Sequence, residues 1–269
     1  MKLLSLIVPV ALLGNLSGAP PVNSFATLRA TAASYDCTFF RLAGMPVAQA
    51  AADPAGLDAV LKKMDAVAAT FHTAQATFEW DTYEKVIDEV DDVQTGSIYY
   101  RRSGQDVEMM ADVKMAGSSA STQKPEPKFV LYSKGRVRIY QPKADQITDY
   151  DLGKNSSEIG SYVVLGFGGS GQDLQKAFDV SYLGPQTVNG VATGELQLVP
   201  KSEKVRNTYN KILLWIDLEK GVSVQQQFWT PQGDYRLTKY SGIRINDKIN
   251  EDVFKFKTTS KTQTILPRG

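Results

Sequence analysis

The chain has 269 residues, of which 42% are hydrophobic and 22% charged, as in an ordinary globular protein. Thirty basic and 29 acidic side chains give a formal charge of +1, and no basic stripe suggests a nucleic-acid partner. A single cysteine, Cys37, excludes an internal disulfide and a cysteine-based zinc cluster, and a single histidine, His72, disfavours the commonest acid–base enzymes. This composition leaves little material for catalysis or metal binding, and we expect no catalytic residue, metal or cofactor.

The N-terminus predicts export. Met1-Lys2 precedes an apolar run from Leu3 to Leu13. This order fits a secretory signal, and the run is shorter than the roughly 20 residues of a membrane span. A buried N-terminal helix is the alternative. We expect residues 1–26 to be a signal peptide, with cleavage possible as late as residue 50, and residues 27–56 to be a linker or targeting tail that the mature protein either keeps or loses.

Residues 57–71 predict an amphipathic helix of about four turns. Lys62, Lys63 and Asp65 take the polar side. The apolar residues recur at spacings of three and four, and they are Leu57, Val60, Leu61, Met64, Val67, Ala68 and Phe71.

Beyond this helix, apolar and polar residues alternate, which places one row of side chains on each face of a strand. Between Val107 and Met115 only Met110 breaks the alternation. Tight-turn sequences such as Asn189-Gly190 separate the segments, and they indicate hairpin-linked antiparallel strands. The expected strands are 76–83, 95–102, 107–115, 128–133, 136–141, 146–152, 180–183, 194–200, 211–218, 222–230, 235–245 and 254–258.

Two interruptions break this series of strands. Residues 117–127 predict a flexible excursion, and residues 153–179 predict one or two short helices across one mouth of the sheet. The glycine-rich string from Gly166 to Gly171 is similar to phosphate-binding loops but lacks a following Lys-Ser/Thr, so a lid hinge is favoured. The predicted fold is mainly β (α+β). One strongly curved antiparallel sheet forms an incomplete β-barrel with an N-terminal helix and a short helical lid, all within one domain, residues 57–269.

Several local strings occur in an order that resembles the LolA family of bacterial lipoprotein carriers, over roughly Leu57 to Ile265. The family's arginine-proline strand end and the tryptophan of its hairpin are replaced by Arg102-Ser103 and by Val137-Arg138-Ile139. The matching strings are FHTAQATF at residues 71–78, GSIYYRR at 96–102, SKGRVRIYQP at 133–142, LVPK at 198–201 and DVFKF at 252–256.

The resemblance implies a monomeric periplasmic carrier that takes acylated lipoproteins from an inner-membrane release complex to an outer-membrane acceptor. It also implies that an arginine on the second strand hydrogen-bonds to the lid and helps to set it open or closed. Arg102 holds that position, although the adjacent Arg101 leaves room for a slip of one residue.

Carrying a lipid through water requires an oily hollow that a mobile element can seal. The candidate lining consists of Ile98, Tyr100, Val107, Met109 and Met115, with plain hydrophobic core as the alternative. Methionine suits such a surface because its unbranched side chain adapts to varied shapes. Two other functions stay open: a sensing or structural binding domain of the same fold for mislocalised lipoprotein or envelope stress, and a glycolipid- or sterol-handling relative.

Overall fold

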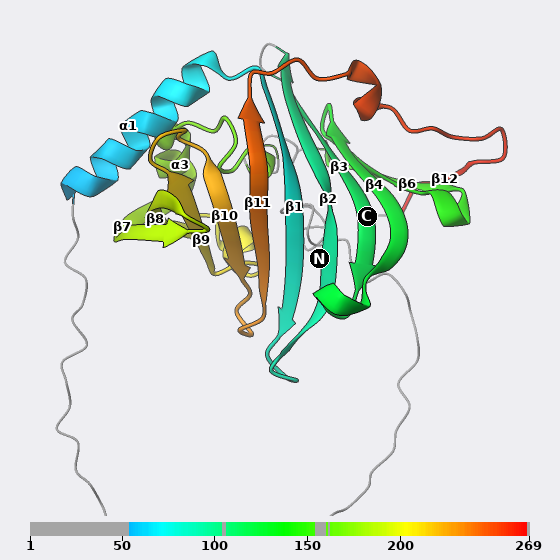
Figure 1. The fold of residues 1–269 in the computed structure, drawn as a ribbon, viewed down its shortest axis with the longest axis horizontal. Helices are drawn as coiled ribbons and strands as arrows, with labels where there is room; N and C mark the ends of the chain where they lie inside the picture. Colours follow the sequence, from blue (N-terminus) through cyan, green and yellow to red (C-terminus); the bar gives the residue numbers. More distant parts are fainter. Residues whose placement is uncertain (1–53, 104–105, 154–159, 161, 268–269) are drawn as a thin grey trace, which may run out of the picture.

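The computed structural model describes residues 54–103, 106–153, 160 and 162–267, and it is built around one 12-stranded sheet (Figure 1). The strand order is β12-β6-β5-β4-β3-β2-β1-β11-β10-β9-β8-β7, so β12 and β7 are free edges and the sheet is open. This confirms the predicted mainly β fold with an incomplete barrel. The predicted signal peptide and nearly all of the predicted linker lie outside the described residues.

The strands are β1 (Thr73–Glu84), β2 (Glu89–Ser103), β3 (Asp106–Gly117), β4 (Lys124–Ser133), β5 (Arg136–Gln141), β6 (Gln146–Asp151), β7 (Phe178–Val188), β8 (Val191–Pro200), β9 (Lys211–Asp217), β10 (Ser223–Trp229), β11 (Tyr235–Ile245) and β12 (Gln263–Ile265). The α-helices with defined bounds are α1 (Pro54–Thr70), α3 (Gly171–Ala177) and α4 (Glu203–Arg206). Short 3-10 turns are η3 (Ala120–Thr122), η4 (Pro142–Ala144) and η6 (Glu251–Phe254).

Helix α1 lies along one side of the sheet, over β7 and β8 (Figure 1). It begins at Pro54, a residue suited to the first turn because that turn needs no backbone donor. Residues 54–56, which the sequence analysis placed in the predicted linker, are thus helical. The apolar stripe of the helix buries Val60, Leu61 and Met64, each at most 6% exposed, against β7, β8 and α3.

Two hydrophobic clusters lie on the inner face of the sheet. The first, called the helix-side cluster, packs α1 and α3 against β7 to β10 and includes Phe178 and Phe228. The second, called the interior cluster, lies under β1 to β6 and β11. Its larger members are Phe71, Phe78, Trp80, Ile98, Tyr100, Met109, Tyr132, Tyr150, Phe167 and Tyr240.

The C-terminal region departs from the prediction, because residues 254–258 do not form a strand. The 3-10 turn η6 ends at Phe254, and the chain packs there on the outer face of β3 to β5, where Phe254 meets Met110 and Leu131. Phe256 contacts the ring of Tyr140 at 5.5 Å between centroids. Phe254 and Phe256 thus anchor this segment by side-chain packing, without the backbone hydrogen bonds of a strand. The last strand is β12, which pairs with β6 in parallel, an exception to the predicted antiparallel sheet.

Candidate functional site

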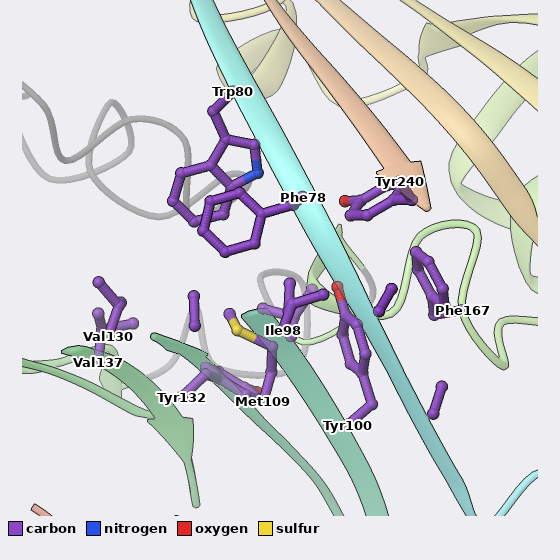
Figure 2. Packing of buried hydrophobic residues seen from close by; sticks show 14 of the residues in the cluster. Phe78, Trp80, Ile98, Tyr100, Met109, Val130, Tyr132, Val137, Phe167 and Tyr240 are labelled. Carbon is purple, nitrogen blue, oxygen red and sulfur yellow. The ribbon is translucent and has the colours of Figure 1, made fainter. Parts of the chain in front are cut away.

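The interior cluster is the candidate binding surface. Ile98, Tyr100 and Met109, three of the predicted lining residues, lie in it and are at most 4% exposed. Figure 2 shows their side chains in the same apolar space as Tyr132 and Val130 from the neighbouring strand β4. Alternation along β1 adds Phe78 and Trp80 to the same face, with their rings stacked at 3.8 Å between centroids.

The other two predicted lining residues are not members of the interior cluster. Val107 has the same facing as Met109, but it is half-buried at the end of the strand, where it pairs with Arg102. The prediction placed Met115 on the same face as Met109, but a bulge between Val113 and Met115 breaks the alternation of β3 and turns Met115 to the other face. Its side chain lines an open cavity of about 520 Å³ together with Thr95 and Ser97, and the inner face ends at Val113.

A lid segment, defined as residues 162–170, crosses the inner face and inserts Phe167 into the interior cluster. The ring of Phe167 is fully buried. It stacks on Tyr100 with 4.9 Å between centroids and meets Tyr240 edge-on at 4.8 Å (Figure 2). Both arrangements are favoured for aromatic pairs. Phe167 therefore occupies the apolar space between Tyr100 of β2 and Tyr240 of β11.

Consecutive carbonyls fix the lid segment to β10. The buried Gln226 side-chain amide donates to the carbonyl oxygen of Leu165 at 2.7 Å. The backbone N–H of Ser223 donates to the carbonyl of Gly166 at 2.8 Å. Because β10 satisfies these two carbonyls, neither is left without a hydrogen bond in the packed lid segment.

Arg102 connects the lid segment to α1. Its Nη2 donates to the carbonyl oxygen of Gly168 at 2.6 Å, and its Nη1 donates to that of Ala68, near the C-terminus of α1, at 3.0 Å. Its guanidinium also lies 5.4 Å from the centre of the Phe71 ring. The planar guanidinium can bridge two carbonyls because its donors are held in a fixed fork.

Arg101, the alternative candidate, points to the other face of the sheet. It forms an ion pair with Glu108 and lies over the ring of Phe254. Successive side chains on a strand face opposite ways. Arg102, and not Arg101, therefore contacts the lid segment.

Two glycines allow the lid to approach this closely. Gly168 has φ +76° and Gly166 has φ +78°, in the left-handed region that favours glycine. A Cβ atom at Gly168 would lie 2.5 Å from Cδ1 of Phe71, and one at Gly166 would lie 2.5 Å from Cβ of Ser223. The glycine-rich string is thus required by contact with the sheet as well as by backbone conformation.

Replacing Gly168 with alanine is expected to detach the lid. The left-handed conformation costs about 1–2 kcal/mol for a residue with a Cβ, and Phe71 must also move. The matched control is Gly190→Ala, because Gly190 has φ +80° and an added Cβ atom there would have no neighbour within 4 Å. Urea unfolding should show a larger loss of unfolding free energy for Gly168→Ala than for Gly190→Ala. Hydrogen exchange of Gly168→Ala should be faster across residues 162–170. Equal losses in the two variants, with unchanged exchange in the lid, would contradict a close lid contact.

The two tyrosine hydroxyls whose rings flank Phe167 are uncharged. Burial is the main cause that raises the pKa of Tyr100 and of Tyr240 above the usual phenol value, so both hydroxyls stay neutral at ordinary pH. Within the described residues, no group of three or more His, Cys, Asp or Glu side chains could hold a metal ion. This surface is apolar, with a few hydroxyl and amide groups.

The sequence pattern missed Phe167, Gln226 and Ser223 as site residues. The signal for Phe167 was available, since it is the one large apolar residue within the glycine-rich string from Gly166 to Gly171. Alternation places Gln226 on the same face as Phe228, but no local pattern in the sequence indicates that it meets Leu165.

Solved structures with a similar arrangement include a Pseudomonas aeruginosa MucA/MucB complex, which is 16% identical and has a TM-score of 0.43, covering 74% of this chain and 61% of that one. A LolA superfamily protein from Nitrosomonas europaea is 13% identical with a TM-score of 0.36, covering 74% and 97%. The lipoprotein LppX from Mycobacterium tuberculosis is 12% identical with a TM-score of 0.44, covering 74% and 98%. No protein-family model and no curated protein sequence matches the chain.

These matches concern the fold alone. The identities are below 25% and the TM-scores below 0.5, so no activity or partner is transferred from them. The chain also spans only about three fifths of the length of the MucB chain that it matches. Separately, none of the helices in the described part of the chain has the length and apolar character that crossing a bilayer requires.

Proposed function

We propose that the protein is a carrier that shelters the acyl chains of lipoproteins in its half-barrel and ferries them through the periplasm toward the outer membrane. The observation that carries this proposal is Phe167, a side chain of the lid that fills the apolar interior in the closed state. A lid that occupies the binding space can leave it to admit cargo. It can also return to expel the cargo.

The energies favour such an exchange. Each buried methylene contributes about 0.8 kcal/mol, so ten methylenes of one acyl chain contribute about 8 kcal/mol. Removing a phenylalanine from a packed interior costs about 3–5 kcal/mol, judged by Phe-to-Ala substitutions. Cargo therefore displaces the plug, while the competition lowers the net affinity enough to permit release.

Arg102 is assigned the role of a latch in this scheme. In the closed state it bridges the carbonyls of Gly168 and Ala68, so lid opening must break at least one charge-assisted hydrogen bond. The partners proposed are an inner-membrane release complex that loads the carrier and an outer-membrane acceptor that unloads it, with the carrier acting as a monomer.

Native mass spectrometry of protein purified from an envelope fraction tests this function. The expected result is a set of adducts whose masses match acylated lipoproteins and which transfer to acceptor vesicles. Adducts that bind but never transfer would support the sensing alternative, and glycolipid adducts alone would support the glycolipid-handling one. Protein that stays free of any acylated species, even after incubation with a triacylated lipopeptide, would refute the carrier.

A further inference from the structure

The turn between β1 and β2 carries exposed aliphatic side chains. The hairpin projects beyond the neighbouring strands at the lower end of the sheet (Figure 1). Residues 85–88, called the hairpin tip, include Val86, which is 96% exposed, and Ile87, which is 55% exposed; Val90, next to the tip, is 38% exposed. Three of the seven exposed large hydrophobic residues in the described chain thus fall within five positions.

The hairpin tip is held in place and is not a loose loop. The Tyr83 hydroxyl donates to the Asp88 carboxylate across the neck of the hairpin. The Lys85 backbone N–H donates to the side chain of Asp234 at 3.0 Å, which ties the tip to the β10–β11 turn. The ring of Tyr83 stacks on that of Tyr235 at 4.5 Å between centroids. A preorganised tip loses little conformational entropy on binding.

Neither the preferences of turns nor core packing explains why Val86 and Ile87 stand in this turn. Turns favour Gly, Asn, Asp, Ser and Pro for conformational reasons, whereas β-branched aliphatic residues favour strands. Neither side chain belongs to any of the three hydrophobic clusters. An exposed pair of this kind at a rigid apex is the pattern of an interaction site.

Negative charge surrounds the aliphatic tip. Residues 84–92 contain five carboxylates and one lysine, and Asp234 adds a carboxylate beside Lys85. Burial, followed by the nearby carboxylate of Asp234, raises the pKa of Glu84, although Arg236 lies 3.6 Å away. Bilayer surfaces are neutral or negative, so they offer no positive charge to compensate these carboxylates.

We infer that the hairpin tip is a docking knob for a protein partner whose surface has an apolar pocket rimmed by lysine and arginine. Val86 and Ile87 enter the pocket, and the surrounding carboxylates pair with the rim. Charge complementarity of this kind sets the choice and orientation of the partner and speeds encounter. The tip lies apart from Arg102 and the lid segment, so this inference does not rest on the proposed carrier function.

A synthetic amphipathic helix of leucine and lysine serves as the probe, because it presents an apolar strip with a basic rim. Fluorescence anisotropy measures its affinity for the full chain. The expected result is a loss of about tenfold or more in affinity for Val86→Ser/Ile87→Ser, a smaller loss for Glu89→Lys, and weaker binding as salt rises from about 0.05 to 0.5 M. Leu218→Ser, which removes an exposed leucine from the β9–β10 turn, should bind as the wild type does.

Equal affinity of Val86→Ser/Ile87→Ser and the wild type would overturn the inference. It would also be overturned if the wild type sedimented with phosphatidylcholine vesicles and the double variant did not, because the tip would then contact a bilayer. Thermal unfolding of each variant is the check that the exposed substitutions leave the fold intact, and the midpoints should equal that of the wild type. Fatty-acid binding, measured on the same variants, should be unchanged, which separates this outcome from failure of the carrier function.

Discussion

Phe167→Ala is expected to destabilise the empty protein and to strengthen its binding of long-chain acyl ligands. The ring is fully buried between Tyr100 and Tyr240, so its removal should lower the free energy of unfolding by about 3–5 kcal/mol. The same change vacates the space that cargo must enter. Because cargo no longer competes with the ring, the dissociation constant should fall by about tenfold or more. Urea unfolding and titration with a fluorescent fatty acid measure the two quantities.

The control is Phe228→Ala. Phe228 is fully buried in the helix-side cluster and packs edge-on against Tyr209, outside the lid segment, so this variant should lose comparable stability without any gain in affinity. If Phe167→Ala binds the fatty acid no better than the wild type, or if both variants gain equally, the ring does not compete with cargo.

Arg102→Leu is expected to retain cargo. The substitution removes the hydrogen bonds to Gly168 and Ala68 that exist in the closed state. It therefore destabilises the closed state more than the open state. Hydrogen bonds to charged groups contribute about 1.5–3 kcal/mol each. A net loss of about 2 kcal/mol from the closed state would shift the equilibrium toward bound cargo by about 30-fold. The measurement is transfer of a triacylated lipopeptide from the loaded carrier to acceptor vesicles.

Arg101→Leu is the matched control for Arg102→Leu. It removes an arginine from the adjacent position and disrupts the pair with Glu108 on the opposite face, without touching the lid. Transfer by Arg101→Leu should equal that of the wild type. Wild-type transfer by Arg102→Leu would exclude the latch.

The sheet could be predicted from the sequence because each strand carries its own two-residue period. The register of β3 could not, since one inserted residue between Val113 and Met115 reverses the facing of everything after it. The wrong prediction of a strand at residues 254–258 has a related cause. Phe254 and Phe256 are two residues apart, as in a strand, but they pack on the outer face of the sheet without backbone pairing.

The candidate site was predictable in part for the same reason. Ile98, Tyr100 and Met109 face inward as regular alternation requires, and the position of Arg102 followed from the family resemblance. The contacts of the lid segment depend on long-range geometry, namely on which strand lies opposite Leu165 and Gly166. A single sequence does not encode that pairing in any local pattern.

Quenching of Trp80 by a brominated fatty acid tests the central claim most directly, because bromine quenches tryptophan only on contact. Trp80 lies in the interior cluster, whereas Trp215 and Trp229 alternate with inward residues and face the other side of the sheet. In Trp215→Phe/Trp229→Phe, binding of the brominated acid should quench the remaining emission of Trp80, and the emission of Trp80→Phe should stay constant. Unquenched Trp80 at a concentration where the acid is bound would contradict an acyl-binding interior.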